Sequence, residues 1–230
     1  MIDNSMSSDS GDPKSENAMS HESSRSPVLS IRQSDPILET KASLRQRLRE
    51  RLKAMPPVEK ATGSTNLCRL LREQTLWKQA RCVLFYAALS DEVDVWPLLE
   101  VAIAEGKIVA LPRYRSEQEG YGAARLQNPG NDVKPGQFGI REPAADCAGV
   151  PLNQLDLILV PGVGFDLNGR RLGRGKGYYD RLLTGIRGAK CGLAFEKQIV
   201  MTIPTEPHDI TLDYIATPSR WVVISGNGRI

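Results

Sequence analysis

One stretch of the chain, Leu155 to Leu183, combines glycines and cationic side chains densely enough to suggest chemistry. Its central part contains Gly169, Gly173, Gly175 and Gly177, interspersed with Arg170, Arg171, Arg174 and Lys176. Glycines allow backbone N–H groups to approach oxyanions, and guanidinium groups form strong charge-assisted hydrogen bonds with phosphate oxygens. The stretch therefore predicts a loop that binds a polyphosphate. The alternative from the residues alone is a solvated basic turn.

The loop matches neither of the common nucleotide-binding motifs. The pattern G-x-x-x-x-G-K-[ST] fails at two positions, because Arg170 replaces its first glycine and Gly177 replaces its final Ser or Thr. The dinucleotide pattern G-x-G-x-x-G fails because Leu167, three residues after Gly164, stands where the third glycine belongs. These mismatches argue against a Walker-type NTPase and against NAD binding.

The elements on either side place this loop at the edge of a buried sheet. Leu155–Val160 is a continuous apolar run, which is typical of a strand buried on both faces. A helix is expected from about Gly177 to Ile186, so the loop follows the carboxyl end of a strand and precedes a helix. Open α/β sheets bind ligands at this edge.

Alternating strands and helices elsewhere predict the fold class. Helices are expected over 41–55 with Thr40 as the cap, over 58–77 with a weak point at Gly63, and over 95–105. Strands are expected over 82–87, 108–111, 191–195, 214–216 and 221–224, whereas 113–151 is interpreted as loops that could include a hairpin. We expect an α/β three-layer sandwich, with a mixed, mostly parallel sheet and helices on both faces.

Composition separates an amino-terminal tail from the rest of the chain. Residues 1–38 are rich in Ser, Asp, Asn and Glu without apolar periodicity, so we expect a disordered tail and one folded domain over 39–230. The tail resembles neither a secretory signal nor a mitochondrial transit peptide. The absence of a run of about 18 apolar residues argues against a membrane span. Four scattered cysteines argue against a zinc site or disulfides, and we expect a cytoplasmic protein.

The loop and several shorter segments closely resemble the 5-formyltetrahydrofolate cyclo-ligases, also called methenyltetrahydrofolate synthetases. The hallmark PG-x-x-FD-x-x-G-x-RLGRGKGYYD of that family matches this chain from Pro161 to Asp180. Supporting segments are KASLR at 41–45, SDEVD at 90–94, LPRY at 111–114 and HDITLD at 208–213. The resemblance covers about Lys41 to Thr217 and implies a fold like that of the sugar-phosphate isomerases and CoA transferases.

Members of the resembled family use ATP and Mg²⁺ to convert 5-formyltetrahydrofolate into 5,10-methenyltetrahydrofolate, with release of ADP and phosphate. The resemblance implies that the γ-phosphoryl is placed on the formyl oxygen before the neighbouring folate amine attacks. Catalysis then rests on positioning and charge stabilisation. Arg174 is the expected catalytic residue. The expected ATP-binding residues are Lys41, Arg45, Arg171, Leu172, Gly173, Arg174, Gly175, Lys176, Gly177, Tyr178 and Tyr179.

The resemblance also implies positions for the metal ion and the folate. Asp180 and Asp213 are expected to hold Mg²⁺, which prefers oxygen ligands; from residue type alone, Asp180 could instead offset a helix dipole. Asp166 is given no direct role and could orient the loop. The expected folate contacts, of which Glu92 would pair with the donor edge of the pterin ring, are Ala87, Glu92, Tyr114, Phe138, Arg174 and Tyr178.

Two other functions remain open from the residues alone. The basic helix and the basic loop could track an RNA backbone, although no RNA-binding module is recognisable and the aromatic residues do not alternate with the cations. A phosphotransferase acting on another small anionic substrate would share the loop but not a folate pocket. Because the net charge is only +3, we expect no nucleic-acid or membrane partner. We expect a monomer that binds ATP and a small folate.

Overall fold

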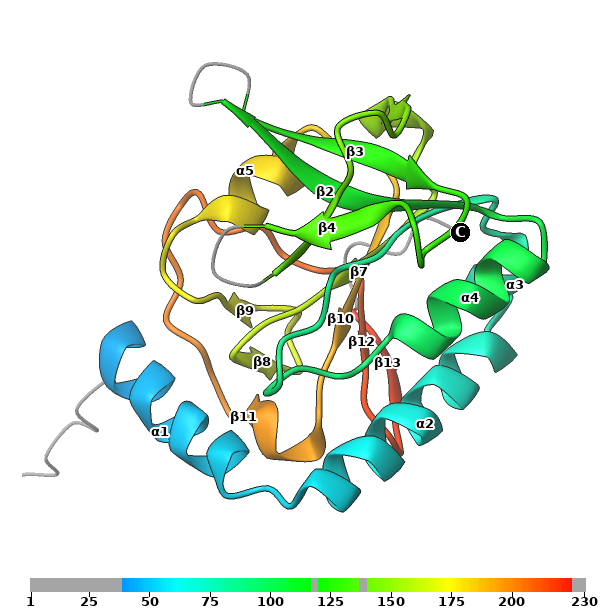
Figure 1. Cartoon of the computed structure of the whole chain (residues 1–230). Helices are drawn as coiled ribbons and strands as arrows, with labels where there is room; N and C mark the ends of the chain where they lie inside the picture. The colour runs from blue at the N-terminus through cyan, green and yellow to red at the C-terminus, as the bar shows by residue number, and fades with distance from the viewer. Residues whose placement is uncertain (1–38, 117–119, 137–139, 225–230) are drawn as a thin grey trace, which may run out of the picture. The chain divides into compact units, whose positions relative to one another are not determined.

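The computed structural model describes residues 39–116, 120–136 and 140–224, which belong to one compact unit. Its centre is an eight-stranded sheet with the strand order β13-β12-β10-β7-β1-β2-β3-β6 (Figure 1). Five neighbouring strands are parallel: β12 (Tyr214–Ala216), β10 (Ala189–Leu193), β7 (Leu157–Val160), β1 (Cys82–Leu84) and β2 (Ile108–Ser116). The antiparallel strands are β13 (Trp221–Val223), β3 (Gly120–Leu126) and β6 (Gly149–Val150). The predicted mixed, mostly parallel sheet is confirmed.

The central strands are buried on both faces. In β1, Val83 packs into one hydrophobic cluster, whereas Cys82 and Leu84 pack into another. The same alternation occurs in β7, where Leu157 and Ile158 belong to different clusters. Because successive side chains of a strand point to opposite faces, each cluster lies on its own side of the sheet. This explains why these strands are continuous apolar runs in the sequence.

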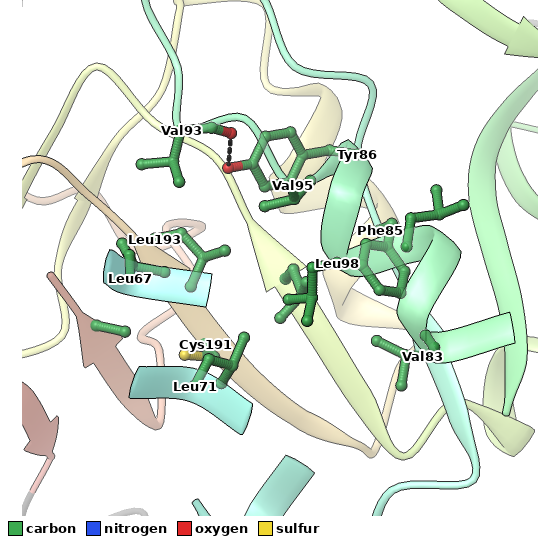
Figure 2. Packing of buried hydrophobic residues seen from close by; sticks show 14 of the residues in the cluster. Leu67, Leu71, Val83, Phe85, Tyr86, Val93, Val95, Leu98, Cys191 and Leu193 are labelled. Carbon is green, nitrogen blue, oxygen red and sulfur yellow. Dashed lines mark hydrogen bonds between the residues drawn. The ribbon is translucent and has the colours of Figure 1, made fainter. Parts of the chain in front are cut away.

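Helices cover the two faces. The first is covered by α2 (Pro57–Glu73), α3 (Thr75–Gln79) and α4 (Trp96–Ala104). Figure 2 shows Leu67 and Leu71 of α2 and Leu98 of α4 among the side chains packed on this face. The second face is covered by α5 (Tyr178–Thr184) through Leu182 and Leu183. The predicted three-layer arrangement is therefore confirmed.

Helix α1 (Lys41–Lys53) packs next to a small sheet of three strands. This sheet contains β8 (Gly164–Asp166), β9 (Arg171–Leu172) and β11 (Ile199–Val200). Leu44 and Leu48 of α1 are buried with Leu172 in a separate cluster. As predicted, Thr40 caps the helix, because its Oγ1 accepts a hydrogen bond from the backbone N of Ser43 at 3.2 Å. This packing fixes the cationic face of α1 relative to β9 and the loop that follows it.

The prediction of one helix over 58–77 is wrong. The backbone at Gln74 is extended, with ψ of 143°, so α2 ends at Glu73 and α3 begins at Thr75. Gly63 does not interrupt α2. A Cβ at Gly63 would lie 3.1 Å from the ring of Phe195, so the glycine allows the helix to pack closely against that ring. The sequence pattern suggested that Gly63 weakens the helix, whereas in the structure Gly63 lets the helix pack closely against Phe195.

The segment 113–151 contains more strand than predicted. β2 and β3 form a hairpin, β3 continues the sheet to β6, and β4 (Val133–Pro135) pairs with β5 (Arg141–Pro143). The suggested hairpin is confirmed, but the interpretation of the remainder as loops is wrong. Glycine and proline are tolerated in strands near the edge of a sheet, and here they obscured the alternating pattern.

Two predictions lie outside the described residues: the disordered tail over 1–38 and the folate contact at Phe138. Within the described ranges, no helix is both long and apolar enough to cross a membrane.

Candidate active site

The glycine-rich loop comprises residues 173–177, between β9 and α5. It follows β7 in the chain, as the sequence predicted, but two strands that were not predicted, β8 and β9, lie between β7 and the loop. The φ angles of Gly175 and Gly177 are +105° and +63°, in a region that residues with a side chain rarely adopt. The turn therefore requires glycine at both positions. The cations that the loop exposes are Arg174 and Lys176.

Asp166 shapes the chain just before the loop. Its carboxylate is fully buried and accepts three backbone hydrogen bonds. Oδ1 accepts from the N–H groups of Asn168 at 2.9 Å and Arg170 at 3.1 Å, and Oδ2 accepts from Ile203 at 2.9 Å. These donors compensate the burial of the charge. Asp166 thus orients the β8–β9 turn, which agrees with the orienting role suggested for it.

Two cations of α1 reach the loop region. Arg45 Nε donates a hydrogen bond to the carbonyl oxygen of Gly173 at 2.8 Å, which ties the first residue of the loop to the helix. Lys41 Nζ lies 2.6 Å from Asp209 and 2.8 Å from Glu206. Burial alone would lower the pKa of Lys41, but the two carboxylates outweigh burial and raise that pKa above its ordinary value. Lys41 is therefore a charged group held in place.

Two open hollows are lined by cations of α1 and of the chain around the loop. One, of about 490 Å³, is lined by Arg174 and by α1 residues that include Arg45, Arg49 and Lys53. The other, of about 470 Å³, is lined by Arg170 and Arg171 together with Glu206, Asp209 and neighbouring residues. An anionic ligand entering either hollow would meet guanidinium groups, which bind phosphate oxygens well.

Arg174 links the loop to the turn that follows β1. Its Nε and Nη2 donate to Glu92 Oε1 at 3.2 Å and 3.0 Å, and Nη2 also lies 2.5 Å from Asp91 Oδ1. The second oxygen of Glu92 accepts a hydrogen bond from the backbone N of Leu89 at 3.0 Å. Burial raises the pKa of Glu92, although the Leu89 N–H and the Arg174 guanidinium favour its ionised form. The expected catalytic arginine and the expected folate-binding acid are thus in direct contact.

Three tyrosine rings form a row next to the loop. The ring centroid of Tyr121 lies 5.2 Å from that of Tyr114 and 5.2 Å from that of Tyr178. Tyr114 and Tyr178 are 46% and 41% exposed, so each presents aromatic surface to solvent. The ammonium of Lys176 lies 5.6 Å from the ring centroid of Tyr178. A flat aromatic ligand could stack on this row.

Tyr121 was not among the expected site residues. It lies opposite Tyr114 in the β2–β3 hairpin. Burial, followed by its neighbour Tyr178, raises the pKa of Tyr121 to about 12, so the phenol stays neutral at physiological pH. The register of the hairpin identifies Tyr121 as part of the row, and the sequence pattern did not reveal that register.

The two carboxylates expected to hold Mg²⁺ do not come together. Asp180 lies in the first turn of α5, where its Oδ1 accepts from Arg171 Nη2 at 2.9 Å. Asp213 directly precedes β12, at the edge where the parallel strands begin, and its Oδ2 accepts from the backbone N of Lys190 at 2.8 Å. The glycine-rich loop lies at the opposite edge. The structure therefore does not support Asp180 and Asp213 as a pair, because Asp213 joins β10 to β12.

The same HDITLD segment supplies a different carboxylate on the loop side. Potential ligand atoms of Glu206, His208 and Asp209 lie within 4.8 Å of one another, and Asp209 contacts Lys41. Oxygen and imidazole groups are common metal ligands. The segment contains two aspartates, and the sequence offered no means of deciding between them. The fold places Asp209, not Asp213, beside the cations of α1.

The remaining expected residues differ in what they contact. Leu172 is buried with Leu44 and contributes packing. Tyr179 packs against both hydrophobic clusters of the main sheet, and burial raises its pKa far above the ordinary value. Ala87 lies between β1 and the turn that carries Glu92, and it is half-buried.

Known proteins that are similar in sequence to this chain carry one family name. The model of the 5-formyltetrahydrofolate cyclo-ligase family matches residues 37–218. A 5-formyltetrahydrofolate cyclo-ligase of Mus musculus is 31% identical over 191 residues, which cover 76% of this chain and 92% of that protein. The protein of the same name from Escherichia coli K12 is 30% identical over 177 residues, which cover 75% and 97%.

Solved structures support the same assignment. The NMR structure of Aquifex aeolicus 5,10-methenyltetrahydrofolate synthetase superposes with a TM-score of 0.74 at 32% identity, over 83% of this chain and 95% of that one. A 5,10-methenyltetrahydrofolate synthetase from Mycoplasma pneumoniae has a TM-score of 0.63 at 23% identity, over 78% and 99%, and shows the shared fold. The match to the family model, the curated relatives and the shared fold together show that this chain belongs to the 5-formyltetrahydrofolate cyclo-ligase family, a family of ligases.

Proposed function

We propose that the chain catalyses the ATP- and Mg²⁺-dependent conversion of 5-formyltetrahydrofolate into 5,10-methenyltetrahydrofolate, with release of ADP and phosphate. Family membership supports the reaction class. The observation that carries the proposal is the bridge from Arg174 to Glu92, because it connects a loop suited to phosphate with an acid suited to a pterin. The guanidinium of Arg174 thus lies between the proposed phosphate site and the proposed folate site.

The ATP phosphates bind between α1 and the loop. Lys41 and Arg45 lie one turn apart on α1, and Arg45 is already tied to Gly173. Arg174 lines one of the two hollows and Arg171 lines the other. The remaining ATP contacts, from Leu172 to Tyr179, come mainly from the loop backbone, which its glycines leave accessible. Helix α5 spans only seven residues, so we assign the binding to the cations and the loop.

Oxygen ligands for Mg²⁺ are available next to these cations. Asp180 and Asp209 both pair with cations of the proposed ATP site, Arg171 and Lys41. We assign the metal to these two acids, with phosphate oxygens and water completing its coordination. Bound Mg²⁺ would neutralise charge on the transferred phosphoryl group. Asp213 is not proposed as a ligand.

The folate binds between the Glu92 turn and the row of tyrosines. A buried carboxylate can accept two hydrogen bonds from the donor edge of a pterin, and the exposed faces of Tyr114 and Tyr178 can hold the flat rings. Ala87 lines the approach to Glu92. The formyl group then points toward Arg174, which contacts Glu92 directly.

The residues explain how the reaction would proceed. A formamide oxygen is a poor leaving group, so the γ-phosphoryl of ATP is first transferred to it, and ADP leaves. The neighbouring folate amine then attacks the activated carbon and loses its proton to solvent, and phosphate departs as the C–N double bond forms. Arg174 stabilises the charge on the transferred group in both steps. The enzyme's contribution is positioning and electrostatic stabilisation, with no covalent enzyme intermediate.

The first test is the absorbance of the methenyl product after mixing the protein with 5-formyltetrahydrofolate, ATP and Mg²⁺, with each component omitted in turn. We expect a rise only when all are present. No rise with folded protein would contradict the proposed reaction. Release of ADP without the methenyl product would instead favour a phosphotransferase.

The assignment of Glu92 has a separate test. Glu92→Ala should weaken folate binding while leaving ATP binding within about twofold of wild type, because Glu92 reaches the proposed ATP site only through Arg174, which also pairs with Asp91. Glu100→Ala, which removes an exposed acid of α4, is the matched control. Equal losses of folate and ATP affinity in Glu92→Ala would mean that this acid supports the fold of the site and does not contact folate.

A further inference from the structure

Arg174 is held by two consecutive acids whose environments differ. Glu92 is 8% exposed and already uses its second oxygen on the backbone N of Leu89. Asp91 is 25% exposed, and it accepts a hydrogen bond from Arg174 Nη2. The two carboxylates therefore share one guanidinium while differing in burial and in their other partners.

The proposed function requires Glu92 to change partners. In the free protein, Oε1 of Glu92 accepts from both Nε and Nη2 of Arg174. A pterin that donates to this oxygen competes with the guanidinium for its lone pairs. Asp91 carries no such requirement. It remains available to Arg174 when Glu92 is engaged with folate.

The loop itself cannot fix the side chain of Arg174. Its neighbours on both sides are Gly173 and Gly175, which have no side chains to pack against the arginine, and φ of Gly175 is +105°. The backbone is anchored at Gly173 by Arg45. The guanidinium end needs a second anchor, and a charge-assisted hydrogen bond with a carboxylate is a strong one.

From these contacts we infer that Asp91 is a positioning residue that holds the guanidinium of Arg174 toward the reacting phosphoryl group while Glu92 binds folate. This inference rests on the proposed function and adds a residue to it. Asp91 touches neither substrate. It acts through Arg174, so its removal should lower the rate of the chemical step and leave the binding of both substrates nearly unchanged.

The test compares Asp91→Asn with Asp146→Asn, which removes an exposed acid of the same type between β5 and β6. We expect kcat of Asp91→Asn to fall by roughly 10-fold to 100-fold, with the KM values for ATP and folate within about threefold of the control. Asp91→Glu, which retains the carboxylate, should recover part of the loss. If Asp91→Asn melts at the assay temperature, Asp91→Ser replaces it.

A second arm asks whether Asp91 acts through Arg174. In an Arg174→Lys background, Asp91→Asn should lower kcat by a clearly smaller factor than in wild type, because the lysine keeps the charge but loses the planar fork that Asp91 and Glu92 hold together. If the losses of kcat from the two substitutions multiply, Asp91 acts independently of Arg174, and the inference is overturned. A kcat within twofold of Asp146→Asn, or a raised KM for folate with unchanged kcat, would overturn it as well.

The proposed function and the role of Asp91 can be refuted separately. A wild-type protein that forms no methenyl product would remove the proposed function and this inference with it. An active wild type with an unaffected Asp91→Asn variant would remove only the role of Asp91.

Discussion

Replacing Arg174 by alanine should abolish most turnover. Its guanidinium contacts the folate-side acids directly, and it extends from a loop that Arg45 anchors to α1. Removing one preorganised donor aimed at transition-state charge lowers kcat by about 10²-fold to 10³-fold in comparable sites. This corresponds to about 3–4 kcal/mol of lost transition-state stabilisation. Arg174→Lys keeps the positive charge without the planar guanidinium, so its kcat should lie between those of wild type and Arg174→Ala.

The same change should have little effect on folding. The side chain of Arg174 is 36% exposed, and its pair with Asp91 is partly solvated, so that pair contributes about 0–1 kcal/mol. Glu92 loses its counter-charge, but burial already raises its pKa, so the group can accept a proton and need not remain a buried charge. We expect the melting temperature to fall by no more than about 4 °C.

The assay follows methenyl absorbance and thermal melting for wild type, Arg174→Ala, Arg174→Lys and Arg69→Ala. Arg69 is an exposed arginine of α2 that serves as the matched control. A folded Arg174→Ala variant with the turnover of Arg69→Ala would refute the role of Arg174. Loss of turnover together with unfolding would show that the estimate of its structural contribution is wrong.

Two further predictions concern stability. Gly188→Ala should destabilise the protein strongly, because the added Cβ would overlap the backbone oxygen of Leu155. The added Cβ of Gly106→Ala would meet no atom, so this variant should lose only about 1 kcal/mol of folding free energy, through its φ of +78°. Equal melting temperatures of the two variants would contradict the close approach at Gly188. Burial favours a raised pKa for Glu196, but hydrogen bonds from Arg220 and two hydroxyl groups outweigh it and lower that pKa below 4.5. The stabilisation is therefore present above the unfolded pKa and is lost as pH falls through the folded pKa. The difference in melting temperature between wild type and Glu196→Gln should be largest near neutral pH and shrink in acid. A difference that does not change with pH would show that the ionised carboxylate of Glu196 is not its cause.

The parallel core could be predicted from the sequence because its signal is local. Leu157–Val160 is apolar at every position, and burial on both faces is the simplest reason for such a run. The strands near the edge could not be predicted in this way. Tyr114 and Tyr121 belong to a hairpin whose pairing depends on register, and proline and glycine in the same segment resemble loop residues.

The site residues also differ in whether their role could be predicted from the local sequence. The glycines and arginines of the loop are contiguous, so their chemistry was visible in the sequence. The choice between Asp209 and Asp213 was not visible, because the two acids are only four positions apart in the chain, yet Asp209 contacts Lys41 of α1 whereas Asp213 contacts the backbone of β10. A resemblance locates the segment, and only the fold decides which carboxylate faces the cations.

The cations proposed to bind ATP already have partners within the protein. Lys41 pairs with Asp209, Arg171 with Asp180, and Arg174 with Glu92. Phosphate binding would therefore exchange one set of anionic partners for another, and would not neutralise free charges. Such an exchange keeps the cations oriented before the ligand arrives, and it reduces the net free energy gained from each new ion pair. Arg174 is the clearest case, because its partner Glu92 is the acid proposed to bind folate. Entry of folate would weaken the contact between Glu92 and Arg174 while Asp91 continues to hold the guanidinium, so Arg174 would stay oriented as it exchanges one carboxylate for the phosphoryl group.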